Sequence, residues 1–499
     1  MLPQYPDVPG ACALYQLPSF PGVTAGSETV APMRRGLSRL PRVAVTGLAL
    51  LVSACAGTTP DSAGVSRTLP AEAEFNSPLP PAARFSGGPV EPARRSNAQM
   101  ARDFLDLEFQ MESGRRVERL TRFEGPVTVV MTGDVPPSAA ADLDLLIARL
   151  RHEAGIDISR VGSGPASITV EFRPKAQLQR FVPTAACYVV PNVRGLADYR
   201  AKRGSAAVDW TRMEERTSAT VFVPSDTSPQ EVRDCLHEET AQALGPLNDL
   251  YRLPDSVYND DNFHTVLTGF DMLMLKVHYA PDLRNGMSEA EVAAVLPGVL
   301  SRANPAGGAV GSIPAGSVTP REWAQAIETA FGSRAALNER QAAARRAVAI
   351  GQAQGWRDTR MAFAWFALGR LTTGTDPDLS ADAFRSAKAI YASLPGCSVH
   401  AAHADMQIAA FDLSRGRFQE ALALADGAIP AVRTAQNAAL LATLLQIRAE
   451  ALDGMGRTVE AQAARAESLG WARYGFGSDV EVMARMADIA ALAAAGRRG

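Results

Sequence analysis

The chain has 499 residues, enough for two or three domains, and its 46% hydrophobic and 21% charged content are typical of a globular protein. Its formal net charge of -3 leaves no basic surplus to neutralise phosphates, so we expect no nucleic-acid partner. No apolar run reaches the roughly 20 residues of a membrane-spanning helix.

Residues 33–55 predict export. A basic stretch opening at Met33 precedes the apolar run 43–51, which ends in Val52-Ser53-Ala54-Cys55. This order is that of a secretory signal peptide. Because the cysteine directly follows small residues, the segment resembles the lipobox of bacterial lipoproteins. The resemblance implies a lipid on Cys55, a membrane anchor in the cell envelope, and sorting to the outer membrane facing the periplasm. The alternatives are a plain signal peptide with an incidental cysteine and a weak membrane span, although the apolar run has only about half the roughly 20 residues that a span needs.

The flanking segments lack a globular pattern. Residues 1–32 have no basic region and contain scattered Pro and Gly, which suggests a doubtful N-terminal extension. Residues 56–97 are rich in Ala, Pro, Ser, Gly and Thr, a composition that buries little apolar surface, so we expect a flexible tether.

Residues 98–300 predict a mixed domain of helices and strands. Strand signals occur at 127–130, 167–172 and 218–223, and apolar residues recur at helical spacing in 143–150. Of the five cysteines, Cys187 and Cys235 form a candidate disulfide in an oxidising periplasm. Two buried free thiols are the alternative, because sequence does not fix connectivity.

Residues 301–319 are rich in Gly, Ala, Pro and Ser and predict a linker, whereas 320–499 are Ala-rich and helical. The hexapeptide starting at Gly416-Arg417 is echoed forty positions later at Gly456-Arg457. This pattern resembles tetratricopeptide repeats, which stack helical pairs and present a concave surface to a protein partner. An irregular Ala-rich bundle is the alternative.

A helix predicted at 229–244 carries the candidate chemistry. Ser228 before Pro229 is a helix start and Gly245 is a stop. Glu239 falls in the middle of the apolar face, where a carboxylate must be paired, coordinated or protonated. Glu238 and Gln242 share one edge of that face, and His237 points away.

From Glu238 to Asp249 the sequence resembles the metzincin pattern H-E-x-x-H-x-x-G-x-x-H-D. The resemblance places Glu238, Gln242 and Asn248 at the three zinc-ligand positions and Glu239 at the general-base position. Asp249 matches outright, and Met272, within 270–274, stands for the methionine of the turn beneath the site. Together with Phe109-x-x-Glu112-Ser113-Gly114, these motifs resemble a bacterial family of unknown function over residues 98–300. No activity comes with the resemblance.

One carboxylate and two amides suit a hard cation such as calcium better than zinc, so a divalent metal ion is the candidate cofactor. The alternative is a polar network without metal. His264 and His278 are candidates for a replacement ligand, although each is more simply a structural histidine. Asp255, Asp260 and Asp261 offer further oxygens, and we interpret them as a solvated loop.

We therefore expect an α+β zincin-like domain followed by an all-α helical-repeat (tetratricopeptide-like) domain. Two functions remain open. The first is a non-catalytic binding protein with a partner at its repeats. The second is a variant metallopeptidase of the cell envelope.

Overall fold

The computed structural model describes residues 79–86, 91–183, 185–310, 318–332 and 334–498. The predicted extension 1–32, the signal segment 33–55 with Cys55, and most of the tether 56–97 lie outside the described residues. Among the helices that are described, none combines the length and the apolar character needed to cross a bilayer.

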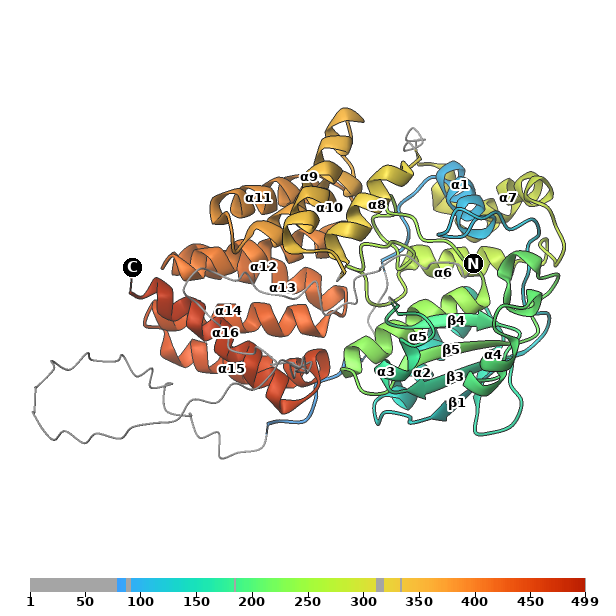
Figure 1. Ribbon diagram of the computed structural model, residues 1–499, viewed down its shortest axis with the longest axis horizontal. Coiled ribbons are helices and arrows are strands. Elements are labelled where there is room, and N and C mark those ends of the chain that lie inside the picture. The colour runs from blue at the N-terminus through green and yellow to red at the C-terminus, as the bar shows by residue number, and fades with distance from the viewer. Residues whose placement is uncertain (1–78, 87–90, 184, 311–317, 333, 499) are drawn as a thin grey trace, which may run out of the picture. The chain divides into compact units, whose positions relative to one another are not determined.

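A five-stranded sheet lies at the centre of the N-terminal half of the described chain (Figure 1). Its order is β2-β1-β3-β5-β4, and only the edge strand β4 is antiparallel to its neighbour. The strands are β1 (Val127–Gly133), β2 (Ile158–Val161), β3 (Ile168–Arg173), β4 (Tyr188–Pro191) and β5 (Ala219–Pro224). The predicted strand signals correspond to β1, β3 and β5, whereas the four-residue strands β2 and β4 were not predicted.

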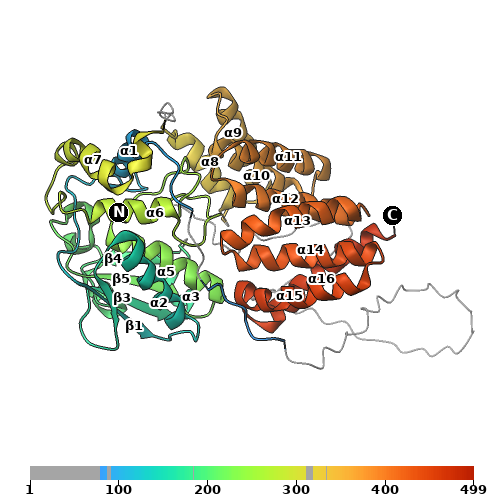
Figure 2. The ribbon, with the colours of Figure 1, turned by 180° about the vertical axis from the view of Figure 1, so that it is seen from behind.

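The two faces of the sheet enter different cores, because successive strand side chains point to opposite sides. On β5, Val221 packs in the larger core with helices α2 (Ala139–Arg149) and α5 (Pro229–Leu244). Its neighbour Phe222 packs instead with Tyr188 and with Tyr199 of α4 (Leu196–Lys202). Figure 2 shows α2 and α5 together over one face of the sheet.

Further helices belong to this half of the described chain. They are α1 (Asn97–Glu108), α3 (Lys175–Leu178), α6 (Gly269–His278) and α7 (Glu289–Ala303). A π-helical turn at Leu150–Ala154 continues α2, and 3-10 turns occupy Ala206–Val208, Trp210–Arg212 and Pro305–Gly308. The last turn belongs to the segment predicted as a linker.

The rest of the described chain is helical. Its helices are α8 (Arg321–Phe331), α9 (Leu337–Ala353), α10 (Thr359–Thr372), α11 (Pro377–Ser393), α12 (Ser398–Ser414), α13 (Phe418–Thr434), α14 (Ala438–Gly454), α15 (Thr458–Phe476) and α16 (Asp479–Gly496). Each packs against the next in sequence, and α14 also contacts α12 and α16. This pattern of neighbour contacts is typical of repeat-like helical regions.

The echo at Gly416 and Gly456 corresponds to a repeated turn. Both glycines have positive φ, 72° and 76°. In each turn the following arginine closes the same backbone hydrogen bond at 2.9 Å, from Arg417 N to Asp412 O and from Arg457 N to Leu452 O. The sequence repeat therefore encodes a repeated left-handed helix end, a position that favours glycine.

The described part of the predicted tether differs from a free linker. Phe85 stacks on Trp471 of α15 with ring centroids 4.4 Å apart, and Ala83 N donates to Gly470 O at 2.9 Å. Further on, Arg95 pairs with Asp103 at 2.6 Å and also with Asp255. An aromatic ring and an arginine with two carboxylates give this small-residue segment enough contacts to be ordered.

Candidate functional site

Helix α5 is fixed at both ends. At its start the Ser228 side chain accepts from Glu231 N at 3.1 Å, with Pro229 in the first turn, as predicted. At its end the buried Arg216 guanidinium donates to the carbonyls of Gln242 at 2.7 Å, Ala243 at 2.8 Å, and Gly245. These bonds satisfy carbonyls that a helix C-terminus leaves without intrahelical partners.

A disulfide fixes the middle of α5. Cys187, directly before β4, is bonded to Cys235, with Cα atoms 5.9 Å apart. This is the cysteine pair proposed from the sequence. Because β4 also pairs with β5, the edge of the sheet and α5 form one cross-linked unit.

Glu239 lies inside the protein, on the buried face of α5. It is 5% exposed, and its Oε2 has no hydrogen-bond partner among the described residues. Burial, together with the charges of Glu238 and Glu112, raises its pKa well above the usual range. Glu238 is half-buried, and burial and the charge of Glu112 raise its pKa to about 7.

The two amides at the ligand positions have partners within the protein. Gln242 Nε2 donates to Asp249 Oδ2 at 3.3 Å. Asn248 Nδ2 donates instead to the carbonyl oxygen of Asp106, near the end of α1, at 2.8 Å. Gln242 thus contacts the candidate site through Asp249, whereas Asn248 ties the loop after α5 to α1.

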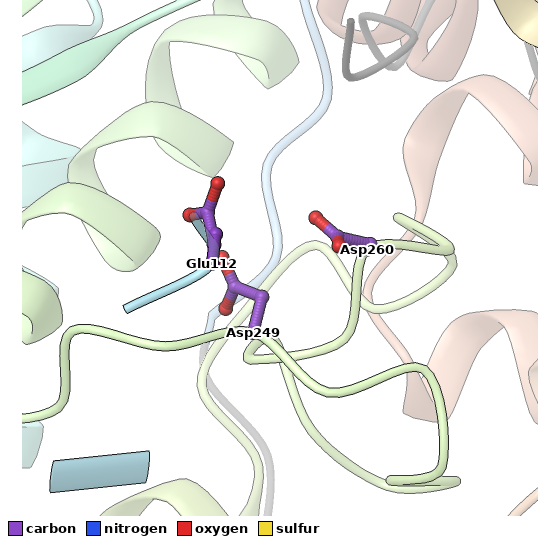
Figure 3. A group of neighbouring side chains, drawn as sticks. All are labelled: Glu112, Asp249 and Asp260. Atoms are coloured by element: carbon purple, nitrogen blue, oxygen red, sulfur yellow. The ribbon is translucent and has the colours of Figure 1, made fainter. Parts of the chain in front are cut away.

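The structure brings together a trio of acidic residues, Glu112 from the loop after α1, and Asp249 and Asp260 from the loop between α5 and α6 (Figure 3). If one carboxylate oxygen is taken from each residue, the three oxygens all lie within 4.8 Å of one another. All three side chains are half-buried. Figure 3 shows the Asp260 carboxylate directed toward the other two. We call these residues and the adjacent Glu238 and Glu239 the carboxyl cluster.

Burial and, after it, like charges raise the pKa values of the carboxyl cluster. Burial is the largest cause of the raised pKa of Glu112 and of the strongly raised pKa values of Asp249 and Asp260, and neighbouring carboxylates add to it. Each of these carboxyl groups therefore keeps its proton to a higher pH than a carboxyl group in water does.

Sequence reasoning missed two of these residues as site members. The sequence pattern includes Glu112 only as part of the family motif, and it predicts that Asp260 lies in a solvated loop. That loop is not solvated: Asp261 is 1% exposed and pairs with His400 of α12 at 3.1 Å, and Asp255 pairs with Arg95. The Glu-Ser-Gly motif at 112–114 was the available signal, but only the fold shows that it faces Asp249.

The predicted histidine and methionine candidates lie elsewhere. His264 Nε2 is 3.2 Å from Pro254 O, and the buried His278 contacts Glu108 at 2.8 Å. His237 Nδ1 accepts from Leu267 N at 3.2 Å. Met272 is buried within helix α6 rather than in a turn, because Thr268 caps that helix just before Gly269.

These features define a two-part protein: a mixed α/β domain with a partly buried carboxyl cluster, followed by a helical region. Residues 97–298 match a family described as "Protein of unknown function (DUF2927)". The matched segment agrees with the 98–300 range of the family resemblance in the sequence. No curated protein and no solved structure matches the chain.

Proposed function

We propose that this chain is a lipid-anchored protein of the bacterial cell envelope. Its α/β domain is a zincin-like domain that binds a ligand without hydrolysing it, and its tetratricopeptide-like helices dock a protein partner. The export signal at 33–55 and the cysteine at 55 support the location.

The observation that carries the non-catalytic role is the chemistry of the ligand positions. Catalytic zinc sites use imidazole, thiolate and carboxylate ligands with one open position. Here two of the three positions are amides, and the Asn248 amide donates to Asp106 O at 2.8 Å. The three histidines discussed above each contact a group outside the carboxyl cluster.

Two features support the zincin-like interpretation of the domain. Helix α5 follows β5 directly and presents Glu239 on its buried face, next to Glu238. The helix ends at Gly245, and the chain then returns so that Asp249 accepts from Gln242. Both features are those expected where a helix and the loop after it share one site.

A variant metallopeptidase is the second candidate, and Glu239 favours it. A buried carboxyl with a raised pKa is the type of group that exchanges protons at neutral pH. In this alternative Glu238, Gln242 and Asn248 hold the metal and Glu239 acts as base.

Proteolysis by the full chain distinguishes the two candidates. Cleavage of casein and of a mixed peptide library is measured with added zinc, with added calcium and with chelator, for the parent and for Glu239→Gln. We expect no cleavage by either protein. The non-catalytic role is contradicted if the parent cleaves a substrate and Glu239→Gln does not. The control is the exposed-site variant Glu118→Gln, which should then cleave as the parent does.

Lipid attachment is tested separately. In a bacterial host fed a labelled fatty acid, the parent should carry label and sediment with membranes, whereas Cys55→Ser should carry none. An unlabelled, soluble parent contradicts the anchor.

A further inference from the structure

The carboxyl cluster has an unusual charge balance for the interior of a protein. None of its five members makes an ion pair with a lysine, arginine or histidine among the described residues. The members are Glu112, Glu238, Glu239, Asp249 and Asp260. The charge of Glu328 on α8 also acts on Glu112 and Asp260, although Glu328 itself pairs with Arg321 at 3.0 Å. Burying charge without a partner is costly, so such a cluster needs either protons or a cation.

Glu239 points to a ligand independently of the trio. Its side chain is 95% buried, from its 5% exposure, yet Oε2 has no hydrogen-bond partner among the described residues. Its carboxyl is close enough to Glu238 and Glu112 for their charges to act on it. Asp249 Oδ1 is likewise buried and without a described partner. Native proteins rarely leave such oxygens unsatisfied, so these two oxygens require a proton, a water molecule or a bound ion.

We propose that Glu112, Asp249 and Asp260 bind one hard divalent cation of the calcium class, with Glu238 and Glu239 beside it. Calcium takes six to eight oxygen ligands at about 2.3–2.6 Å, so ligands on opposite sides of one ion are about 5 Å apart. The three oxygens lie within 4.8 Å of one another, which suits a single central ion.

The donor atoms select the cation class. All three ligands are carboxylates, with no sulfur or imidazole, a set that favours calcium, magnesium or manganese over zinc. Loops rather than regular elements supply the ligands, which suits the flexible geometry of calcium better than the strict octahedron of magnesium. The ligand set also differs from the one predicted from sequence, because Glu112, Asp249 and Asp260 take the place of Glu238, Gln242 and Asn248. The cation site does not depend on whether the domain hydrolyses anything.

Thermal unfolding of the full chain tests the site. We expect calcium to raise the midpoint of the parent relative to chelator, because a ligand that binds only the folded state stabilises it. The variant Glu112→Gln/Asp260→Asn should lose this calcium shift. In chelator it should unfold at or above the parent midpoint, since two like charges are removed. This opposite behaviour in the two buffers separates a lost site from a damaged fold, and Glu118→Gln, exposed in the same domain, should behave as the parent.

Terbium luminescence provides a direct readout, because terbium replaces calcium and is sensitised by nearby aromatic rings. Burial raises the pKa of Tyr251, and the nearby charges of Asp260 and Glu112 raise it further. The Tyr251 ring centroid lies 5.1 Å from that of Trp323. We expect ultraviolet-excited emission from the parent that calcium displaces and that Glu112→Gln/Asp260→Asn loses. Absence of both emission and a calcium shift, or stabilisation by zinc but not by calcium, overturns the calcium-class site.

Discussion

At the scale of single residues, Arg216 is the side chain that most directly positions the carboxyl cluster. It is 4% exposed, and its guanidinium lies 5.0 Å from the centroid of the Trp210 ring. Its hydrogen bonds to three carbonyls at the end of α5 hold the helix just before the turn that leads to Asp249. A single arginine therefore fixes where the loop after α5 begins.

We predict that Arg216→Met destabilises the protein by about 3 kcal/mol or more, because it leaves buried carbonyls unsatisfied after the loss of charged hydrogen bonds. Urea unfolding of the parent and the variant measures the effect. Arg212→Met, at a site whose side chain is 68% exposed, serves as the control and should change the unfolding free energy by less than about 0.5 kcal/mol. An equally small effect of Arg216→Met would show that water replaces the guanidinium.

Residue identities predicted only part of the site. The burial of Glu239 followed from helical periodicity, because a sixteen-residue helix with clear start and stop signals fixes which side chains face inward. Glu112 and Asp260 lie in loops, where no periodicity relates one residue to another. Their meeting with Asp249 depends on chain reversals whose geometry is set by contacts far away in the sequence.

At the scale of elements, the cross-link between the β4 segment and α5 is the main covalent constraint. The two cysteines are 48 positions apart, and the loop between them includes β4, α4 and β5. The disulfide closes a loop of this length in the unfolded chain and lowers the entropy of that state. The folded protein is thereby stabilised by about 4 kcal/mol.

We predict that Cys187→Ala/Cys235→Ala lowers the unfolding free energy by about 4 kcal/mol and shifts the urea midpoint accordingly. A reductant should lower the stability of the parent by a similar amount and leave the double variant unchanged. If the parent resists reductant and equals the double variant, then the two thiols are not bonded in the protein.

Helices and strands that are long and have a regular hydrophobic pattern could be predicted from the sequence, whereas short ones could not. Long amphipathic helices and the Gly416 and Gly456 turns follow from local sequence, as do β1, β3 and β5. The four-residue strand β4 is buried on both faces, so it shows no alternation, and its antiparallel pairing is set by the neighbouring β5. Short strands of this kind are defined by their partners rather than by their own residues.

At the scale of the whole molecule, the loop from Tyr251 to Val266 links the α/β domain to the helical region. Asp261 contacts His400 of α12, and Phe263 packs on Phe366 of α10 with ring centroids 5.2 Å apart. Composition predicted a solvated loop here because three aspartates stand close together. The burial arises from aromatic and histidine partners more than a hundred positions later, which local sequence does not reveal.

This connection makes stability depend on pH through His264, which lies against His400 with ring centroids 5.3 Å apart. Burial, together with the charge of His400, lowers the pKa of His264 from 6.5 to about 4, although Asp261 and Asp255 act in the opposite direction. At pH values between about 4 and 6.5, the unfolded chain therefore binds more protons at His264 than the folded chain does. The stabilisation is fully present above pH 6.5 and is lost as the pH falls toward 4.

We predict that protonation of His264 lowers the free energy of unfolding by about 3 kcal/mol as the pH falls from 6.5 to about 4. A difference of one in pKa corresponds to about 1.4 kcal/mol. The carboxyl cluster acts with the opposite sign, because its raised pKa values favour the folded state as the pH falls. The difference between parent and His264→Gln, followed by urea unfolding from pH 7 to pH 4, isolates the histidine. The slope should be shallower in His264→Gln and unchanged in the exposed-site variant His152→Gln. Equal slopes in all three proteins would mean that His264 remains accessible to protons in the folded state.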